Sequence, residues 1–556
     1  MLSDDILLNI FRHYLDASPQ CWPALVCVCQ RWRETIFTSP LGLNLRLYCT
    51  YGTPVLMTLD FWPALPIIIQ YGGLPNHDPP TPEDEDNIIA ALKQSGRVRS
   101  ISLTVTISLL DKLSAISEPL SELETLALLS QDNMRLAFPS TFRWGPRLRT
   151  IHLTRIAFPS FPQLLLPCQD LVDLQLHEIP ISGYFSPEAF ANALSEMAQL
   201  ESLVLHFLSL PSRRNHLSLP SPSGERVILP ALRAFEYRGT SKYLDSFAAR
   251  IDAPRLQDIN ITLFNQPTMD ALQLGRFFER MEIQESLTQA DVRTSEHAIS
   301  ISFTNSSTST PLRLQISSKQ FDWQLSSMAQ ICDQCSPFLF CVKELSVNTT
   351  QSPSEQDNTN LGGEQWPELI RAFNGARDFH VAGAHVPDIL CALRPADQGR
   401  ITGPTTLPAL LGLHTEKPIE MQGPSWDAVQ SFIASRTLSG RPVKVHVPSY
   451  QCHICDANFE HQQGLKRHLG VKHVYRVVCM YCGDFECTPA RGRNTLLREH
   501  LEGEHPDVAR KDALISNPFL TNLSPLQLET LAYRHGSVRA PDPAAPFTAV
   551  TVPQPQ

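Results

Sequence analysis

Two cysteines and two histidines near the carboxyl end of the chain have the spacing of a metal site. Two residues separate the cysteines, twelve lie before the first histidine and four lie between the histidines, and the residues are Cys452, Cys455, His468 and His473. Two thiolates and two imidazoles form a ligand set that zinc binds tetrahedrally. Phe459 and Leu465 supply the two apolar side chains that so small a unit can bury. The spacing therefore predicts a zinc site whose segment depends on the metal for folding.

A second group with a looser spacing follows. It consists of Cys479, Cys482, His500 and His505, with seventeen residues between the inner cysteine and the first histidine. We expect these four residues to bind a second zinc ion in an enlarged unit, with Phe485 and Leu497 as its apolar candidates. Cys487 lies inside the enlarged centre and could replace one of the four as a ligand.

Both groups resemble the two-Cys, two-His zinc finger, which has a ββα fold. In that family a helix can read DNA bases, and the matching positions of the first group are His461, Gln463, Gly464 and Arg467. Residues 451–510 carry eight basic and eight acidic side chains, whereas phosphate binding favours a basic surface. The five residues between the two groups also lack the Thr-Gly-Glu-Lys-Pro type of linker. We therefore favour protein binding or structural capping, with a nucleic-acid-binding regulator as the alternative.

The composition is that of a globular protein that acts away from membranes. Of 556 residues, 42% are hydrophobic and 18% are charged, which suits several folded domains. The net charge of -10, with no run of Lys or Arg, disfavours attraction to nucleic acid or to an anionic membrane. No signal-peptide pattern and no apolar run of about 18 residues is found, so we expect the cytoplasm and/or the nucleus. The fourteen cysteines are then interpreted as reduced thiols and metal ligands.

The first fifty residues have the pattern of a small helical module. Ser3 is a good N-cap, and Asp4 and Asp5 follow where the positive end of a helix favours acidic side chains. Apolar residues then recur at helical spacing as far as Leu15, and a second helical stretch covers residues 18–40. Helices this short and this apolar must be covered by the rest of the chain or by a partner.

These residues carry a resemblance to a known family. The string from Leu2 to Phe11, with Trp22, the segment 28–33 (Val-Cys-Gln-Arg-Trp-Arg) and Ser39-Pro40, resembles the F-box of fungal F-box proteins, which usually have Leu-Pro in place of Leu2-Ser3. In that family the helices bind the Skp adaptor of a cullin-RING ubiquitin ligase, and the remainder of the chain selects a substrate. The resemblance implies that the adaptor contacts Leu2, Leu7, Leu8, Ile10, Phe11, Leu15 and Trp32. The alternative is an amphipathic helix that packs on the body of the protein.

An apolar-x-x-apolar-x-apolar pattern recurs through the middle of the chain. It begins at Val98, Leu123, Leu148, Leu171, Leu200, Leu232 and Leu256, at spacings of 25, 25, 23, 29, 32 and 24 residues. This is the period of leucine-rich repeats, in which each unit adds a short parallel strand and a return segment. Two alternating runs at 299–303 and 312–316 predict a pair of strands, and the pattern returns at Val342 and Ala376. We expect an irregular, curved α/β body, with an ordinary α/β domain around a parallel sheet as the alternative.

Together the patterns predict a multidomain α/β protein. Its expected parts are an F-box-like helical module at 1–50, a proline-rich connection and helix at 51–96, a leucine-rich-repeat-like body at 97–415, a helix and linker at 416–450, two zinc fingers at 451–506, and a short helix with a disordered Pro/Ala-rich tail at 507–556. The sequence contains no Gly-x-Ser-x-Gly elbow, phosphate-binding Gly-rich loop or His-Glu-x-x-His helix, so we do not expect an enzyme. We expect the substrate-recognition subunit of an SCF-type ubiquitin ligase, which binds the Skp adaptor and an unidentified protein substrate.

Overall fold

The computed structural model describes most of the chain. The residues that it does not describe are 1, 41, 52, 54, 73–79, 117, 131–142, 158–160, 209–225, 265, 267, 283–286, 296, 306–307, 318–320, 350–364, 384, 394–405, 416–423, 447–449, 452–457, 460–475, 480, 483–485, 488–494, 512–535 and 540–556. The chain divides into two compact units, one built from residues 1–414 and 420–445 and the other from residues 415–419 and 446–556.

The first unit begins with a small group of helices. They are α1 (Asp4–Ala17), η1 (Pro19–Cys21), α2 (Trp22–Val26) and α3 (Gln30–Thr38). The expected helical stretch after residue 18 is thus divided, because Pro19 and Pro23 each suit only the first turn of a helix. Phe11 on the inner side of α1 packs edge-on against Trp32 of α3, with 4.8 Å between the ring centroids. Trp22 Nε1 donates a hydrogen bond to the carbonyl of Arg46 at 2.6 Å, which ties the helices to the chain that follows.

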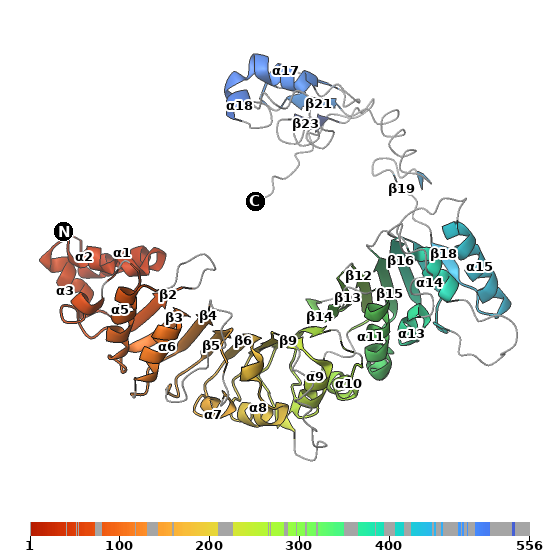
Figure 1. Ribbon diagram of the computed structural model, residues 1–556. Helices are drawn as coiled ribbons and strands as arrows, with labels where there is room; N and C mark the ends of the chain where they lie inside the picture. Colours follow the sequence, from red (N-terminus) through yellow and green to blue (C-terminus); the bar gives the residue numbers. More distant parts are fainter. Residues whose placement is uncertain are drawn as a thin grey trace. The chain divides into compact units, whose positions relative to one another are not determined.

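Most of the first unit is one sixteen-stranded sheet (Figure 1). In spatial order its strands are β1 (Leu47–Cys49), β2 (Ile67–Tyr71), β3 (Val98–Val105), β4 (Thr125–Ser130), β5 (Thr150–Thr154), β6 (Asp173–Ile179), β7 (Ser202–Phe207), β9 (Ala234–Gly239), β11 (Asp258–Phe264), β14 (Thr308–Ser317), β13 (Ala298–Asn305), β12 (Gln289–Thr294), β15 (Glu344–Thr349), β16 (Asp378–Gly383), β17 (Gly412–Thr415) and β18 (Lys444–His446). A separate pair is formed by β8 (Val227–Ile228) and β10 (Ile251–Asp252).

The repeated apolar positions stack in register from strand to strand. The second position of each repeat forms one row across paired strands, consisting of Ile101, Leu126, Ile151, Leu174, Leu203, Phe235 and Ile259. The third position forms a parallel row from Leu103 to Ile261, and both rows are buried. Because side chains alternate across a strand, the residues between these positions lie on the opposite face of the sheet. The expected stacking of short parallel strands is confirmed.

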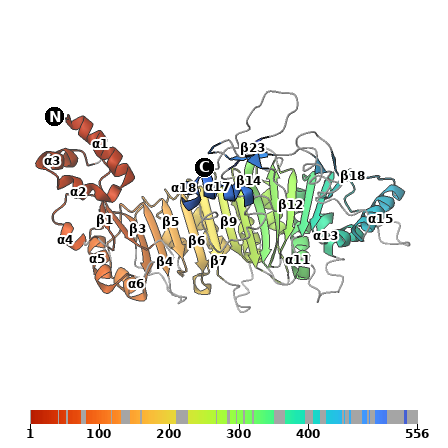
Figure 2. The same ribbon diagram turned by 90° about the horizontal axis from the view of Figure 1, so that it is seen from above.

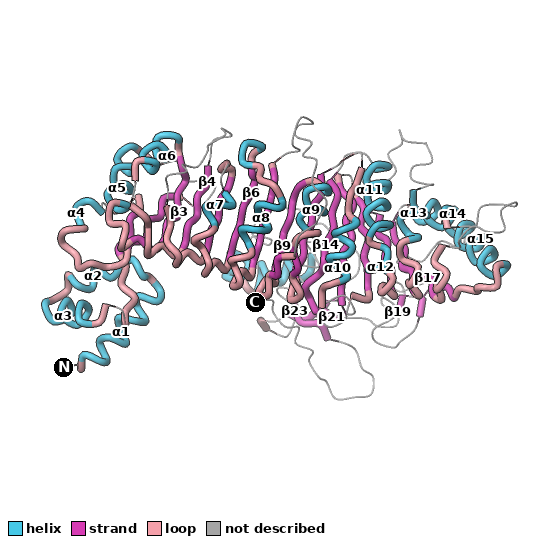
Figure 3. The backbone as a smooth tube through the Cα atoms, turned by 90° about the horizontal axis from the view of Figure 1, so that it is seen from below, coloured by secondary structure: helices cyan, strands magenta, loops and turns pink. Residues whose placement is uncertain are grey.

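Helices cover the apolar face of the sheet. They are α4 (Val55–Thr58), α5 (Pro82–Leu92), α6 (Ile107–Ser114), α7 (Phe161–Leu165), η2 (Ile181–Gly183), α8 (Pro187–Leu194), α9 (Ser241–Ala248), α10 (Leu272–Glu279), α11 (Phe321–Gln334), α12 (Ser336–Leu339), α13 (Gln365–Arg371), α14 (Val386–Ala392) and α15 (Pro424–Leu438). Figures 1 and 3 show α7 to α11 along the convex side of this sheet, and Figure 2 shows strands β5 to β9 from the other side, where no described helix of the same unit covers them. Within the described residues, no helix is long and apolar enough to cross a membrane.

The strand order departs from sequence order at one place. After β11 the chain passes to β12, returns through the antiparallel strands β13 and β14, and then continues to β15. Consequently β14 pairs with β11, and β12 pairs with β15, both in parallel. The strands expected at 299–303 and 312–316 are present as β13 and β14, whereas β12 was not expected.

Among its described residues, the second unit contains short strands, magenta in Figure 3, and two helices. Its described elements are β19 (Tyr450–Gln451), β20 (Asn458–Phe459), β21 (Arg476–Cys479), β22 (Glu486–Cys487), α17 (Thr495–Glu504), α18 (Pro506–Lys511) and β23 (Gly536–Arg539). β21 pairs with β22 on one side and with β23 on the other, both antiparallel. β23 arises from a segment that we expected to be a disordered tail, while the helix expected near 524–534 lies outside the described residues.

Candidate functional sites

Four side chains of the second expected zinc group converge in the second unit. They come from the end of β21, the turn after it, α17 and the residue after α17, and are Cys479, Cys482, His500 and His505. Their ligand atoms all lie within 4.8 Å of one another, and Cys482 Sγ is 3.3 Å from His500 Nε2. Metal–ligand bonds of about 2.0–2.3 Å in a tetrahedron place ligand atoms about 3.3–3.8 Å apart. The group therefore has the size and the donor atoms to hold a metal ion.

The backbone around the two histidines explains how both reach this point. Residues five apart on a regular helix point well away from each other. Here α17 ends at Glu504, and His505 occupies the break before Pro506 begins α18. His505 Nε2 is buried and has no hydrogen-bond partner among the described residues, which is the environment expected of a nitrogen that coordinates a metal ion.

The thiols of this group lie in a partly desolvated position. Burial raises the pKa of Cys479, while backbone N–H groups of Tyr481 and Cys482 oppose that rise. A bound cation would favour the thiolate form, so metal binding would release protons. Cys487 belongs to β22, and its side chain lies outside the described part of the chain, as do all four residues of the first expected zinc group, Cys452, Cys455, His468 and His473.

The side chains expected to contact an adaptor are divided between the interior and the surface. Leu7, Phe11 and Leu15 are buried in the helical group, so they hold the helices together and are not available to a partner. Leu8 and Trp32 are half-buried, whereas Leu2 and Ile10 are exposed.

An apolar stripe lies on the exposed side of α1. On α1, Ile6, Ile10 and Tyr14 are 47%, 47% and 45% exposed at intervals of four residues, and Leu2, two residues before the helix, is 51% exposed and extends the stripe. Ile6 and Tyr14 were not among the residues expected to contact an adaptor, although their spacing of four residues from Ile10 indicates that they share its side of the helix. Arg31 Nη2 of α3 binds Asp4 Oδ1 at 2.7 Å and the carbonyl of Leu2 at 2.6 Å, which fixes the start of the stripe.

The face of the sheet opposite the covering helices, here called the helix-free face, carries a group of polar residues that the sequence patterns did not single out. His152 Nε2 of β5 lies 2.7 Å from Asp173 Oδ2 of β6, and Gln175 Nε2 donates to both oxygens of Asp173. Further along, His177 Nδ1 of β6 lies 3.2 Å from His206 Nδ1 of β7. Burial lowers the pKa of His177 and of His206.

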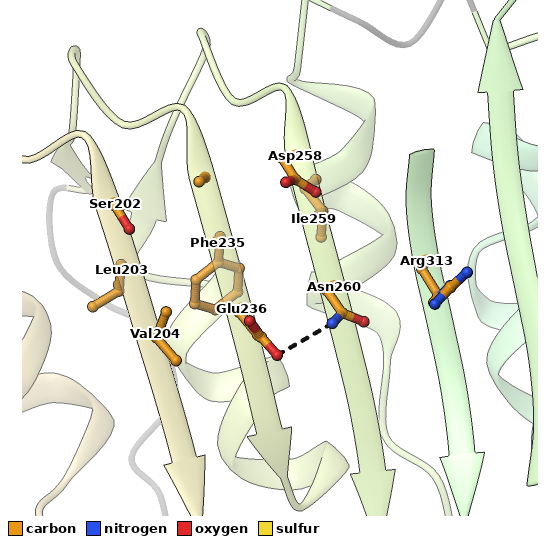
Figure 4. Close-up of a pocket in the computed structure, with 10 residues that line it drawn as sticks. Ser202, Leu203, Val204, Phe235, Glu236, Asp258, Ile259, Asn260 and Arg313 are labelled. Atoms are coloured by element: carbon orange, nitrogen blue, oxygen red, sulfur yellow. Dashed lines mark hydrogen bonds between the residues drawn. The ribbon is translucent and has the colours of Figure 1, made fainter. Parts of the chain in front are cut away.

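The polar chain continues to Glu236 of β9. His206 Nε2 lies 3.1 Å from Glu236 Oε1, and Asn260 Nδ2 of β11 donates to the same oxygen at 3.2 Å. Next to this contact the face is hollowed over β7, β9, β11 and β14, with a volume of about 330 Å³ (Figure 4). The lining side chains include Ser202, Val204, Ala234, Glu236, Asp258, Asn260 and Arg313. The only signal in the sequence was that the residue between two repeated apolar positions is often polar.

The chain was also compared with known proteins. No protein-family model matches it, and no curated protein matches its sequence.

Proposed function

We propose that this protein is the substrate-recognition subunit of an SCF-type ubiquitin ligase. In this proposal the N-terminal helices are an F-box that binds the Skp adaptor, and the sheet is an irregular leucine-rich-repeat-like body that holds a protein substrate. The chain transfers nothing itself, because its role is to raise the concentration of substrate beside the conjugating enzyme. It would act in the cytoplasm and/or the nucleus, where such ligases work.

The exposed apolar stripe of α1 is the observation that carries the proposal. Ile6, Ile10 and Tyr14, at successive i, i+4 positions, form one face on a helix whose other face is already packed, and the exposed Leu2 lies just before that helix. An amphipathic helix with an unburied apolar face is suited to dock into a groove of a partner. The F-box resemblance of residues 2–11, which include three of the four stripe residues, supports the adaptor as that partner.

The metal site supports the recognition part of the proposal. Two thiolates with two imidazoles favour zinc over the harder cations that prefer oxygen ligands. Four protein ligands would fill the coordination sphere, leaving no position for a catalytic water, so we assign zinc a structural role here. Zinc would hold β21 and α17 together as a finger that contacts a protein.

Co-purification with the Skp adaptor tests the proposal. Changing Ile6 and Ile10 together to Ser removes half of the stripe without touching a buried residue. Ile6 and Ile10 are each already about half buried, so covering the rest of each side chain in an interface contributes about 0.7–1.5 kcal/mol, and the double variant should bind the adaptor at least about tenfold more weakly. The matched control changes Arg12 and Asp16, two exposed polar residues of the same helix, to Ser and should bind as the wild type does.

Two results would count against the proposal. One is a folded, zinc-loaded wild-type protein that does not retain the adaptor. The other is an Ile6/Ile10 variant that retains it as well as the Arg12/Asp16 control, which would mean that the stripe is not the docking face.

A further inference from the structure

The hollow on the helix-free face has a floor of small side chains and an acidic rim. Ser202 of β7 and Ala234 of β9 are register partners, and Val204 lies two residues along β7 on the same face as Ser202. Asp258 of β11 pairs in register with Ala234, while Glu236 pairs with Asn260, so the two carboxylates are diagonal neighbours across β9 and β11. The hollow exists because short side chains lie between longer ones on neighbouring strands (Figure 4).

Both carboxylates retain acceptor oxygens that the protein does not use. The contacts from His206 and Asn260 reach only Oε1 of Glu236, so Oε2 accepts no hydrogen bond from any described residue. The side chain of Asp258 is exposed at the hollow and makes no hydrogen bond or ion pair with a described residue. A ligand with several N–H donors could therefore satisfy three oxygens at once.

The surrounding charges favour a cation. On β6, β7, β9, β11 and β14, the described residues of the helix-free face include the carboxylates of Asp173, Glu236 and Asp258 and the guanidiniums of Arg238 and Arg313, so the carboxylates outnumber the guanidiniums there. Asp173 is already engaged by His152 and Gln175, which leaves the rim of the hollow as the unsatisfied acidic part. The whole chain has a net charge of -10, which would steer basic partners toward it.

A guanidinium on an aliphatic stem matches these features better than a compact cation does. Its planar fork presents five donors and can bind one carboxylate through two bonds while reaching a second. Its methylene groups could lie on Val204 and Ala234, where a hydrated ion would gain nothing. Arg313 of β14 is the register partner of Asn260, and among the described residues its Nε contacts Ser302 Oγ at 3.4 Å on β13, the strand on the side of β14 away from the two carboxylates.

From these contacts we propose that the hollow formed by Ser202, Val204, Ala234, Glu236 and Asp258 binds an arginine side chain presented by a protein substrate. The inference rests on the proposed function, since it names the class of segment, arginine-bearing and basic, that the receptor recognises. Arg313 would form the far rim and could donate hydrogen bonds to a carboxylate that follows the arginine in the bound segment.

Peptide binding to the full-length, zinc-loaded protein tests this inference. The probe is a fluorescein-labelled heptapeptide, Gly-Ala-Arg-Ala-Arg-Ala-Gly, followed by fluorescence anisotropy at low salt, and a second peptide carries Glu in place of Arg. The hollow variant Glu236→Gln with Asp258→Asn keeps side-chain shape and removes two charges. The control variant Asp291→Asn with Glu344→Gln removes two charges from the same face of the sheet, on β12 and β15.

We expect the arginine peptide to bind the wild type and the control alike, and the hollow variant at least tenfold more weakly. Equal weakening in the two variants would reduce the effect to general attraction of charge and overturn the inference, as would a wild type that does not bind below 1 mM or that prefers the Glu peptide. No adaptor is present in this assay. The Ile6/Ile10 variant should bind the arginine peptide normally, so failure of this inference and failure of adaptor docking are separate results.

Discussion

Adjacent residues of α1 should respond to substitution in opposite ways. Phe11 is 1% exposed and packs against Trp32, whereas Ile10 is 47% exposed. Truncating a buried Phe to Ala costs about 3–5 kcal/mol, a figure that includes its aromatic contact. An exposed site away from such contacts changes stability by less than about 0.5 kcal/mol. Phe11→Ala should therefore loosen the helical group, and Ile10→Ala should leave it intact.

Hydrogen exchange of the α1 amides measures this difference directly. Since 1.4 kcal/mol corresponds to a factor of ten, Phe11→Ala should lower protection in α1 by about a hundredfold or more, up to the limit set by local opening. Ile10→Ala should leave protection in α1 nearly unchanged while weakening adaptor binding. Amides of β6 serve as an internal reference, because they lie in the middle of the sheet.

The reasoning fails if Phe11→Ala leaves α1 as protected as in the wild type, or if Ile10→Ala loosens it equally. Either result would mean that α1 packs through a different face from the one described. The stripe of exposed side chains would then not be the docking surface.

Three further results are expected. Leu174→Ala, in the fully buried row of the sheet, should lower the free energy of unfolding by about 2.7–5 kcal/mol in urea titrations, against about 1 kcal/mol for its neighbour Gln175→Ala on the other face. Cys482→Ser should lower the zinc content, measured by mass spectrometry, by one equivalent, and an unchanged content would exclude this residue as a ligand. Burial lowers the pKa of His177 and His206, so as the pH falls these histidines are protonated in the unfolded chain before they are protonated in the folded one. The free energy of unfolding should therefore keep its full value above pH about 6.5 and decrease as the pH drops below it. Comparing urea midpoints at pH 7.5 and 5.5 checks this, and the fall should be smaller in His206→Gln.

The sheet was largely predictable, because its signal is repeated. Each buried row position, such as Leu126 or Leu174, is specified within its own strand by period-two alternation, and regular spacing places equivalent residues side by side. The detour through β12 was not predictable. Its strand contains only two apolar residues, Ala290 and Val292, and local alternation does not say which neighbour a strand will choose.

The functional surfaces were harder to predict for a related reason. In α1 both Phe11 and Ile10 belong to an apolar helical pattern, and only packing shows which of them faces inward. The contact between His206 and Glu236 joins two repeats through strand register, which neither repeat encodes alone. The metal group was found because Cys482 and His500 have chemical identities that few other roles require.

The reversed order of β12 to β14 affects how the sheet can come apart. In a simple stack each repeat contacts only its neighbours, so stability is nearly a sum of local terms and the stack can fray from either end. Here β11, which ends at Phe264, pairs with β14, which lies after Gln289 in the chain. The other edge of β14 pairs with β13. A chain that ended after β11 would expose the whole edge of that strand, and an exposed edge favours pairing with another molecule. The three strands therefore join β11 to β15 in one cooperative block, and shortened versions of this protein should not be divided between β11 and β15.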